Sequence, residues 1–535
     1  MSTALREAPA GVRASTRPGA AWLRWALPLA VPALVIGVAL YPDIHAAMMP
    51  APVAIGILMV AAGAAFAARR PQLLILLPVL AACLPSRQAG FAAYLMALGW
   101  FVAAWGGRRL VRAVDGIDLA LLAVIVWSLA TWIINLGVET DLWSLPVFAL
   151  TLLSPWLLLF VARAAPWSDD DRRLVIAGWL ALTVAQLAPV FLKPPLTGTL
   201  GAYLAPFLVF DLSGFGLLRT LAGADSLDMT YGTTPSAHHL GALLLGAMLY
   251  LVAEAAAARR RPPLLLLIAL LYAFIMTDSK HLVLAAVVPG VVFLIRVIGP
   301  ALPGRARRAL ALGMITVLAA VVLTTGAAIA RVAVAGLWKP YAALAELNPK
   351  LQLVQRTGAL VADGGLTSWI GLGPGSYATR AATIRASDVL YKEGDQLPAF
   401  IPPHTGKSYR SVAYDLYTSA FVDAIRYQSG VLTSPFSSII GIVAEFGILG
   451  TAVVAWFFWM VAAAGWRAWR QAESPTARAA GAVTGFLIPF LLLIGLFDSY
   501  LEQPSVTAPI VLLALVAISA SDQAGRPRSA ERSVS

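Results

Sequence analysis

The stretch LLLLIALLYAFIMTDSKHLVLAAVVPGVVFLI, residues 264 to 295, places the polar residues Asp278, Ser279, Lys280 and His281 between two apolar segments. The flanking segments have 13 and 14 uninterrupted apolar residues, so each spans about 20 Å as a helix. A bilayer's hydrocarbon core is about 30 Å thick. We therefore expect a membrane hairpin with a recessed polar tip. An ionised Lys280 there would need water, a counter-ion or an anionic ligand, or it could snorkel to the lipid headgroups.

The composition of the whole chain agrees with this interpretation. Its 535 residues are 59% hydrophobic and only 12% charged, with a mean hydropathy of +0.79, whereas soluble proteins carry roughly 25% charged residues. A soluble core cannot bury so much apolar surface, so we expect an all-α polytopic membrane protein. The only cysteine, Cys83, excludes an intrachain disulfide. The net charge of +12 comes from short arginine clusters between apolar runs, which indicates topology signals rather than nucleic-acid binding.

Apolar runs of suitable length predict about 14 transmembrane helices, with 12 to 14 as the range. The third run is the shortest and contains Pro78. The predicted spans are 24–41, 51–68, 72–85, 89–106, 117–137, 145–164, 173–193, 236–256, 262–277, 280–297, 308–330, 434–465, 480–498 and 505–520.

Arginine clusters occupy every second connection, as the positive-inside rule requires of cytoplasmic segments. We therefore expect both termini in the cytoplasm. The predicted segments are an N-terminal tail at 1–23, eleven spans within 24–330, a periplasmic loop at 331–433, three spans within 434–520 and a C-terminal tail at 521–535. The first apolar run could instead be a cleaved signal peptide, but the many later spans favour an uncleaved first span. The tip at 277–281 falls on the periplasmic side.

The loop at 331–433 is long enough to fold and is slightly basic, which suits an anionic ligand or simply a solvated surface. Helical spacing occurs in two parts of it. The predicted apolar faces are Leu344, Leu347, Leu351 and Val354 in the first part, and Tyr414, Leu416, Tyr417, Phe421 and Ile425 in the second.

Two further motifs lie in and after this loop. GLGPGSYATR, 371–380, permits a tight turn through Gly371, Gly373 and Gly375, and a helix starting near Tyr377 could bind an anion at its amino end. The alternative is a plain turn between two loop helices. SSIIGIVAEFGILG, 437–450, places Glu445 within an apolar helix. An intramembrane carboxylate is a functional candidate, although Glu445 could equally bond to loop backbone.

Taken in order, four segments resemble the superfamily of O-antigen ligases and O-antigen and exopolysaccharide polymerases. They are LLRTLAGADSLDMTYGTTPSAHHLG (217–241), the TDSK tip (277–280), VQRTGALVADGGLTSWIGLGPGSY (354–377) and AEFGILG (444–450). The family shows a Thr-x-Ser-Arg tip, a loop arginine followed by a Gly-x-Gly-x-Gly turn, and Glu-x-Gly-h-h-Gly after the loop. Lys280 stands where many relatives carry arginine, so phosphate binding there should be less directional.

The resemblance implies a GT-C-like, metal-independent inverting glycosyltransferase of the bacterial inner membrane, without a cofactor. Its substrate would be a polyprenyl-diphosphate-linked oligosaccharide, and its acceptor a glycan or lipid hydroxyl. Arg219 and Lys280 match diphosphate-binding positions. In the loop, Arg356 matches the family's arginine, and it is a candidate for substrate binding together with Gly371, Gly373, Gly375 and Arg380. Membrane lipids are expected partners, and a chain-length regulator or a flippase could be others; nucleic acid is not.

The general base is not identified by the resemblance. Ligases of the family often carry His-Asn just before the span that follows the loop, and the aligned residues here are Phe436 and Ser437. His404 could be a displaced base or an ordinary surface histidine, and Glu445 is the other catalytic candidate. His238, His239 and His281 lie near the same outer face.

The missing His-Asn favours a polymerase over a ligase that transfers the glycan to a lipid A-core or protein acceptor. A lipid-linked oligosaccharide flippase or transporter, and a scaffold partner of a synthase, are the competing classes.

Overall fold

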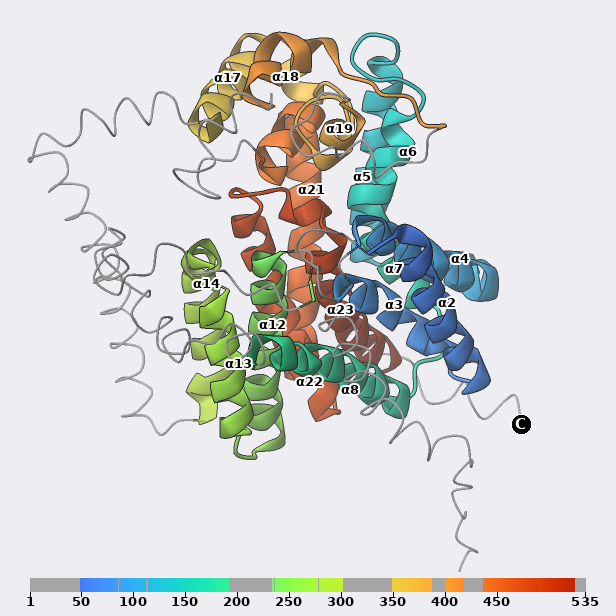
Figure 1. The fold of residues 1–535 in the computed structure, drawn as a ribbon, viewed down its shortest axis with the longest axis vertical. Helices are drawn as coiled ribbons and strands as arrows, with labels where there is room; N and C mark the ends of the chain where they lie inside the picture. The colour runs from blue at the N-terminus through green and yellow to red at the C-terminus, as the bar shows by residue number, and fades with distance from the viewer. Residues whose placement is uncertain are drawn as a thin grey trace, which may run out of the picture.

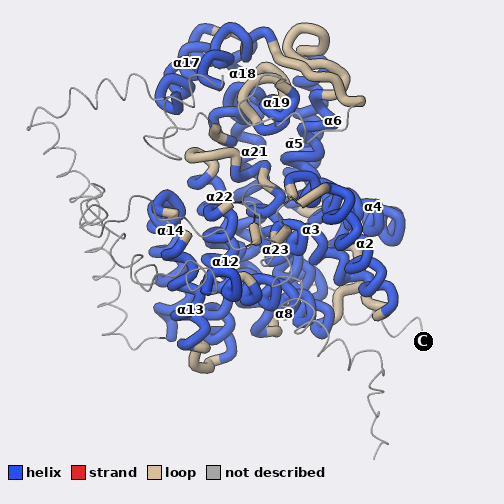
Figure 2. The backbone as a smooth tube through the Cα atoms, in the orientation of Figure 1, coloured by secondary structure: helices blue, strands red, loops and turns tan. Residues whose placement is uncertain are grey.

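The computed structural model describes residues 49–84, 86–111, 114–191, 233–234, 236–277, 279–301, 349–386, 400–417 and 436–524. These residues form helices joined by short connections, and the one isolated backbone bridge among them joins Leu136 and Thr140 (Figure 2).

The helices before the large loop are α2 (Ala51–Ala67), η1 (Pro71–Leu76), α3 (Leu77–Ala82), α4 (Arg87–Val111), α5 (Gly116–Ile134), α6 (Ser144–Phe148), η2 (Ala149–Leu153), α7 (Ser154–Ala162), α8 (Asp169–Ala185), α12 (Ala237–Ala258), α13 (Leu264–Met276), α14 (Lys280–Phe293), η3 (Leu294–Ile298) and η4 (Gly299–Ala301). Those in and after the loop are α17 (Pro349–Asp363), α18 (Leu366–Ile370), α19 (Arg380–Arg385), η6 (Tyr409–Ala413), η7 (Tyr414–Tyr417), α21 (Ser438–Gln471), α22 (Pro475–Ile494), η9 (Tyr500–Glu502) and α23 (Pro504–Ala524).

Within the described residues, nine helical segments are long and apolar enough to cross a membrane. Three shorter apolar segments, 51–67, 71–82 and 264–276, accompany them. The chain is therefore an all-α polytopic membrane protein. The predicted spans at 24–41 and 308–330 lie outside the described residues, so the described part supports nine spans rather than 14.

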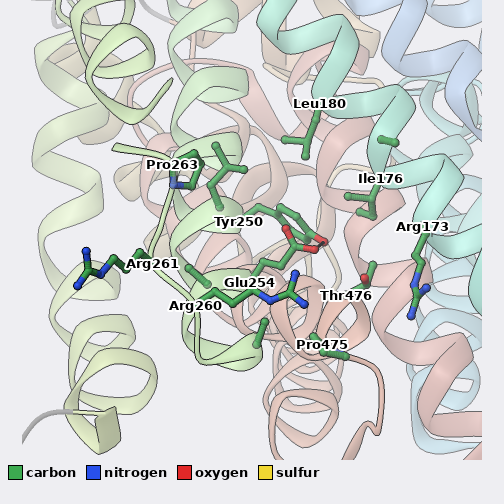
Figure 3. A pocket seen from close by; sticks show the side chains of 14 residues that line it. Arg173, Ile176, Leu180, Tyr250, Glu254, Arg260, Arg261, Pro263, Pro475 and Thr476 are labelled. Atoms are coloured by element: carbon green, nitrogen blue, oxygen red, sulfur yellow. Dashed lines mark hydrogen bonds between the residues drawn. The ribbon is translucent and has the colours of Figure 1, made fainter. Parts of the chain in front are cut away.

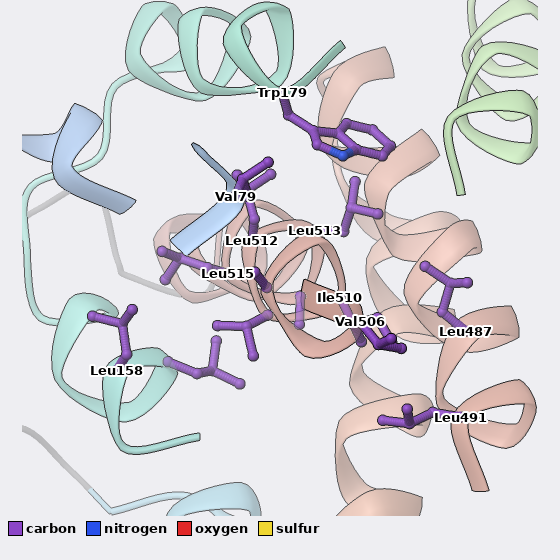
Figure 4. Close-up of a cluster of buried hydrophobic side chains, with 14 of the residues drawn as sticks. Val79, Leu158, Trp179, Leu487, Leu491, Val506, Ile510, Leu512, Leu513 and Leu515 are labelled. Atoms are coloured by element: carbon purple, nitrogen blue, oxygen red, sulfur yellow. The ribbon is translucent and has the colours of Figure 1, made fainter. Parts of the chain in front are cut away.

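Helix α23 forms the centre of the bundle. Its apolar side chains, among them Val506, Ile510 and Leu513, are buried around the whole circumference of the helix. Figure 4 shows them packed against Val79 of α3, Leu158 of α7, Trp179 of α8 and Leu487 and Leu491 of α22. A helix that is apolar on all sides must be surrounded by other elements or by lipid, and here the other helices surround it.

Close approach of two glycines fixes the crossing of α21 and α22. A Cβ atom on Gly465 would lie 2.8 Å from the carbonyl oxygen of Gly481, and one on Gly481 would lie 2.6 Å from the carbonyl oxygen of Gly465. Small residues let helix backbones approach closely enough for extensive van der Waals contact, which drives helix association in lipid.

The arginine-bearing connections meet at one end of the bundle, which we call the basic end. Arg70 pairs with Asp171 at 2.5 Å. The guanidinium of Arg163 is buried among the carboxylates of Asp115, Asp118 and Asp522. These pairs join the ends of α2, α7 and α23 to the starts of α8 and α5. Figure 1 shows α17, α18 and α19 at the opposite end, which we call the loop end.

One predicted span has a different form. The segment predicted at 72–85 is a 3-10 turn, Pro71–Leu76, followed by the short helix Leu77–Ala82. Pro71 opens the first piece, and Pro78 cannot donate the backbone hydrogen bond that would continue a single α-helix through the second. The segment is nevertheless buried against the bundle.

The predicted apolar face of the first loop helix is wrong. Leu351 and Val354 are exposed, whereas Leu353 and Thr357 are buried. Helix α17 begins at Pro349, so the predicted Leu344 and Leu347 lie outside the described residues. In the second part, the prediction that Leu416 and Tyr417 are buried is confirmed, but both belong to a 3-10 turn that follows a π-turn rather than to a regular helix. Phe421 and Ile425 lie outside the described residues.

Candidate functional site

The polar tip predicted from the sequence lies between α13 and α14. Lys280 is the first residue of α14. Thr277 and Ser279 are buried, with their hydroxyl oxygens 3.0 Å apart. Thr277 donates to the carbonyl of Phe274 at 2.7 Å, which closes the last turn of α13. Arg219 lies outside the described residues.

Two histidines meet beside this tip. The rings of His238 on α12 and His281 on α14 are 4.5 Å apart and nearly perpendicular, at 83°. The Nδ1 of His238 lies 2.9 Å from the hydroxyl of Ser279. His238 is half-buried, so it borders the surface, whereas His281 is buried. The sequence places these residues near the outer face, and the structure joins them to the tip.

The connection between α22 and α23 closes the other side of this cluster. The Tyr500 hydroxyl lies 2.8 Å from Nε2 of His281, and the two rings stack with centroids 5.7 Å apart. At the next residue of α12, Nδ1 of His239 lies 2.8 Å from the hydroxyl of Ser505. We call His238, His239, His281, Ser279 and Tyr500 the histidine cluster.

Lys350 anchors the loop over the histidine cluster. Its ammonium group donates to the carbonyl of Phe436 at 2.8 Å and to the carbonyl of Phe497. Burial lowers the pKa of Lys350 to about 8, an effect that the carboxylate of Asp498 opposes. This lysine therefore ties α17 to the chain on either side of α21 and α22.

The glycine turn binds a carboxylate that belongs to the protein itself. One oxygen of Glu445 accepts from the backbone nitrogens of Tyr377 at 2.9 Å and Thr379 at 3.1 Å, and from the Thr379 hydroxyl at 2.7 Å. The other accepts from the nitrogen of Gly375 at 2.6 Å. The turn is thus an anion-binding nest of backbone N–H groups, occupied by Glu445.

Glycine is required where this turn meets α21. Gly371 has φ +86°, and a Cβ atom there would lie 2.3 Å from the carbonyl oxygen of Glu445. The nitrogens of Leu372 and Gly373 donate to the carbonyls of Ala444, at 3.0 Å, and Glu445, at 2.9 Å. These bonds coincide with a kink in α21 at Gly447, where φ is +65°.

A second buried carboxylate lies at the start of α19. The backbone nitrogen of Arg380 donates to Oε2 of Glu502 at 2.5 Å. The helix begins at Arg380 rather than at the predicted Tyr377. Burial raises the pKa of Glu502 to about 8, with a further contribution from the Glu445 carboxylate, while Arg380 acts in the opposite direction. Arg380 is therefore part of the polar layer between the glycine turn and the histidine cluster.

Arg356 lies apart from that layer. Its guanidinium pairs with Asp415 at 2.6 Å and donates to the carbonyl of Val412 at 2.8 Å, which ties α17 to the turns at 409–417. A cavity of about 470 Å³ adjoins it, lined also by Asp363 and Ser411.

His404 lies over the connection between α5 and α6. Its Nε2 donates to the carbonyl of Glu139 at 3.0 Å, because a carbonyl oxygen can only accept. Its Nδ1 is 3.9 Å from Asp141, which also pairs with Arg385. Burial alone would raise the pKa of Asp141. Hydrogen bonds from Arg385 and Ser144 have the larger combined effect and lower the pKa to about 2.

The structure thus gathers some predicted residues and separates others. Lys280 precedes His281 in α14, and Arg380 bonds to Glu502, which lies in the same short helix as Tyr500. The glycine turn binds Glu445, whereas Arg356 and His404 serve other contacts of the loop. Lys350, Tyr500 and Glu502 were missed. A signal for the last two was present, because FDSYLEQ (497–503) places polar residues between two apolar spans just as TDSK does.

Comparison of the sequence with models of known protein families finds no match, and comparison with curated proteins also finds none. Among the described residues, no group of three or more histidine, cysteine, aspartate or glutamate side chains is placed to hold a metal ion.

Proposed function

We propose that the protein is a glycosyltransferase of the outer membrane face that uses a polyprenyl-diphosphate-linked oligosaccharide. The observation that carries this proposal is the histidine cluster, which lies at the end of an apolar bundle, under a folded loop and beside Lys280. Ionisable side chains inside a membrane protein are functional-site candidates, because they commonly mark substrate or ion pathways. The resemblance of four sequence segments to O-antigen ligases and polymerases supports the same reaction.

The proposed fold is GT-C-like, with 14 spans and both termini in the cytoplasm of a bacterium. The nine long helices and three shorter apolar segments would be joined by the undescribed spans at 24–41 and 308–330. In this arrangement the loop end faces the periplasm and the basic end faces the cytoplasm, as the positive-inside rule requires. The loop end is where a lipid-linked glycan, already moved across the membrane, would meet its acceptor.

Lys280 and Arg219 are the proposed diphosphate-binding residues. The leaving diphosphate gains negative charge in the transition state, so a fixed cation in a recessed site stabilises the transition state more than the ground state. The arginine can donate two parallel hydrogen bonds to one phosphate, while the lysine supplies a compact charge.

We assign the general base to His238 rather than to His404 or Glu445. Glu445 already accepts hydrogen bonds from the glycine turn through both oxygens, so its role is to position the loop. When Ser279 donates to the carbonyl of Thr277, at 3.3 Å, Nδ1–H of His238 donates to Ser279. The lone pair is then on Nε2 of a half-buried ring.

The reaction follows from these roles. The acceptor oxygen attacks the anomeric carbon from the side opposite the diphosphate, and Nε2 of His238 takes the hydroxyl proton. The bond from the anomeric carbon to the phosphate oxygen breaks, and its electron pair leaves with the diphosphate next to Lys280 and Arg219. The sugar's configuration inverts.

The test uses purified protein in detergent with a lipid-diphosphate oligosaccharide, and it reads the product sizes. A ladder indicates a polymerase, and a single shift indicates a ligase acting on an added acceptor. Intact oligosaccharide that only changes leaflet in vesicles would indicate a flippase and would refute the proposal.

Variants test the assigned residues. We expect Arg219→Ala and Lys280→Ala each to abolish product, and His238→Asn to lower kcat by about 100-fold or more. Lys407→Ala removes an exposed positive charge from the loop end and is the matched control, with activity retained. Normal product from the Lys280→Ala and Arg219→Ala proteins would refute the diphosphate assignment.

A further inference from the structure

A cavity of about 530 Å³ opens at the basic end, at the opposite end of α12 from His238 and His239 of the histidine cluster. It lies between the start of α8, the end of α12, the α12–α13 turn and the start of α22. Its charged lining residues are Arg173, Arg260, Arg261 and Glu254. The proposed glycosyl transfer uses none of them.

The arginines are arranged around the cavity rather than spread over a surface. Arg260 reaches into its middle below Tyr250 and Glu254, with Arg173 on the α8 side and Arg261 on the opposite side (Figure 3). All three are exposed, and none forms an ion pair with a described residue. At the same end, by contrast, the guanidinium groups of Arg70 and Arg163 are paired with aspartates.

The one carboxylate in the lining does not cancel this charge. Glu254 accepts a hydrogen bond from the Tyr250 hydroxyl at 3.3 Å. Three arginines against a single glutamate leave the lining positive. The start of α22 adds to this field, because its N-cap Ser474 makes no side-chain hydrogen bond to the first turn and Thr476 faces the cavity.

The rest of the lining is apolar and continues toward the membrane. Ile176 and Leu180 of α8 lie above the arginines in the view of Figure 3, and Leu251 of α12 also lines the cavity. Directly after the arginines, Leu264 and Leu265 of α13 are 66% and 85% exposed, as expected of side chains in contact with lipid. The cavity thus combines cations at the membrane boundary with an apolar wall reaching into the bilayer.

We propose that this cavity binds the headgroup of an anionic phospholipid, with the phosphodiester between Arg173 and Arg260 and an acyl chain along Ile176 and Leu180. Basic pockets between transmembrane helices are suited to such headgroups, since each nearby arginine strengthens attraction to anionic lipid. Arginine can hold a phosphate through two hydrogen bonds. A free inorganic phosphate shares the charge but lacks the chain that would use the apolar wall.

Native mass spectrometry of the full chain in detergent tests this proposal with phosphatidylglycerol, phosphatidylcholine and inorganic phosphate as separate probes. We expect phosphatidylglycerol adducts on the unmodified protein and few phosphatidylcholine adducts. The double variant Arg173→Gln/Arg260→Gln should weaken phosphatidylglycerol binding by about tenfold or more. Arg467→Gln, which removes an exposed arginine of the same end outside the cavity, is the matched control and should leave binding unchanged.

Equal phosphatidylglycerol binding by the double variant would overturn the proposal. The assignment to an anionic lipid would be overturned if phosphatidylcholine formed as many adducts as phosphatidylglycerol. It would also be overturned if inorganic phosphate formed as many adducts as phosphatidylglycerol. A second measurement does not depend on the folding of a variant: a phosphatidylglycerol with a photoreactive group in its acyl chain should crosslink to residues 173–180 or 250–265 of the unmodified protein. Crosslinks confined to other segments would also overturn the proposal.

Discussion

At the scale of single residues, Glu445 makes the bonds to loop backbone that the sequence offered as the alternative to a chemical role. Its carboxylate accepts from three backbone nitrogens and one hydroxyl. In Glu445→Gln, one oxygen becomes an NH₂ group that faces an N–H donor. We expect a loss of stability of about 2 kcal/mol, measured as a lower Tm together with faster proteolysis around 371–380. Unchanged stability with lost transferase activity would instead give Glu445 a chemical role.

Glu502 makes the stability of the loop end dependent on pH. Its pKa is raised from 4.5 to about 8, so the folded state holds a proton that the unfolded state releases above pH 4.5. The contribution of the protonated Glu502 side chain to the free energy of unfolding is therefore complete below pH 4.5, and it is lost as the pH rises through 8. We expect Tm in detergent to fall between pH 5 and 9 less steeply in Glu502→Gln than in the unmodified protein. Parallel curves would contradict this prediction.

At the scale of elements, the crossing of α21 and α22 depends on the absence of side chains. In Gly481→Val, the new Cβ atom would lie about 2.6 Å from the carbonyl oxygen of Gly465. We expect this clash to separate the two helices and to reduce the yield of folded protein sharply. Gly56→Ala on α2 is the control, because nothing lies within 4 Å of its added Cβ. Alanine there should stabilise the helix by about 0.5–1 kcal/mol.

Thermal unfolding after size-exclusion chromatography measures the stability of both variants. A Gly481→Val protein as stable as the unmodified one would refute the close-packing argument.

Element positions followed from the sequence where hydrophobicity alone determines them. The described long apolar runs are helices, and the polar residues around Ser279 separate two of them, as predicted. Only α13 is short, because α14 continues through η3 to Ile298 and is long enough to cross a membrane. Prediction failed where backbone chemistry or distant partners decide. Pro78 divides the segment at 71–82, and the buried face of α17 is set by contacts with the chain near 436 and 497, which spacing within α17 cannot reveal. The sequence offered loop backbone as a possible partner of Glu445, but it did not identify the glycine turn, about 70 residues away along the chain, as that partner.

At the scale of the whole molecule, the loop end and the basic end should face opposite sides of the membrane. In a Cys83→Ala background, Ser411→Cys at the loop end should react with a membrane-impermeant maleimide added outside intact cells. Arg467→Cys at the basic end should react only after the membrane is permeabilised. The residues are both exposed, so a reversed pattern would invert the proposed topology, and with it the site of glycosyl transfer.

The position of α23 has a consequence for biosynthesis. This helix supplies the centre of the bundle, yet it is the last described helix to leave the ribosome. Helices α3, α7, α8 and α22 therefore enter the bilayer before α23 does. Until α23 is inserted, lipid, the insertion machinery or the other helices must cover their inward faces. A chain stopped before Pro504 would present those faces permanently, which makes it a substrate for membrane proteases rather than a partly active protein.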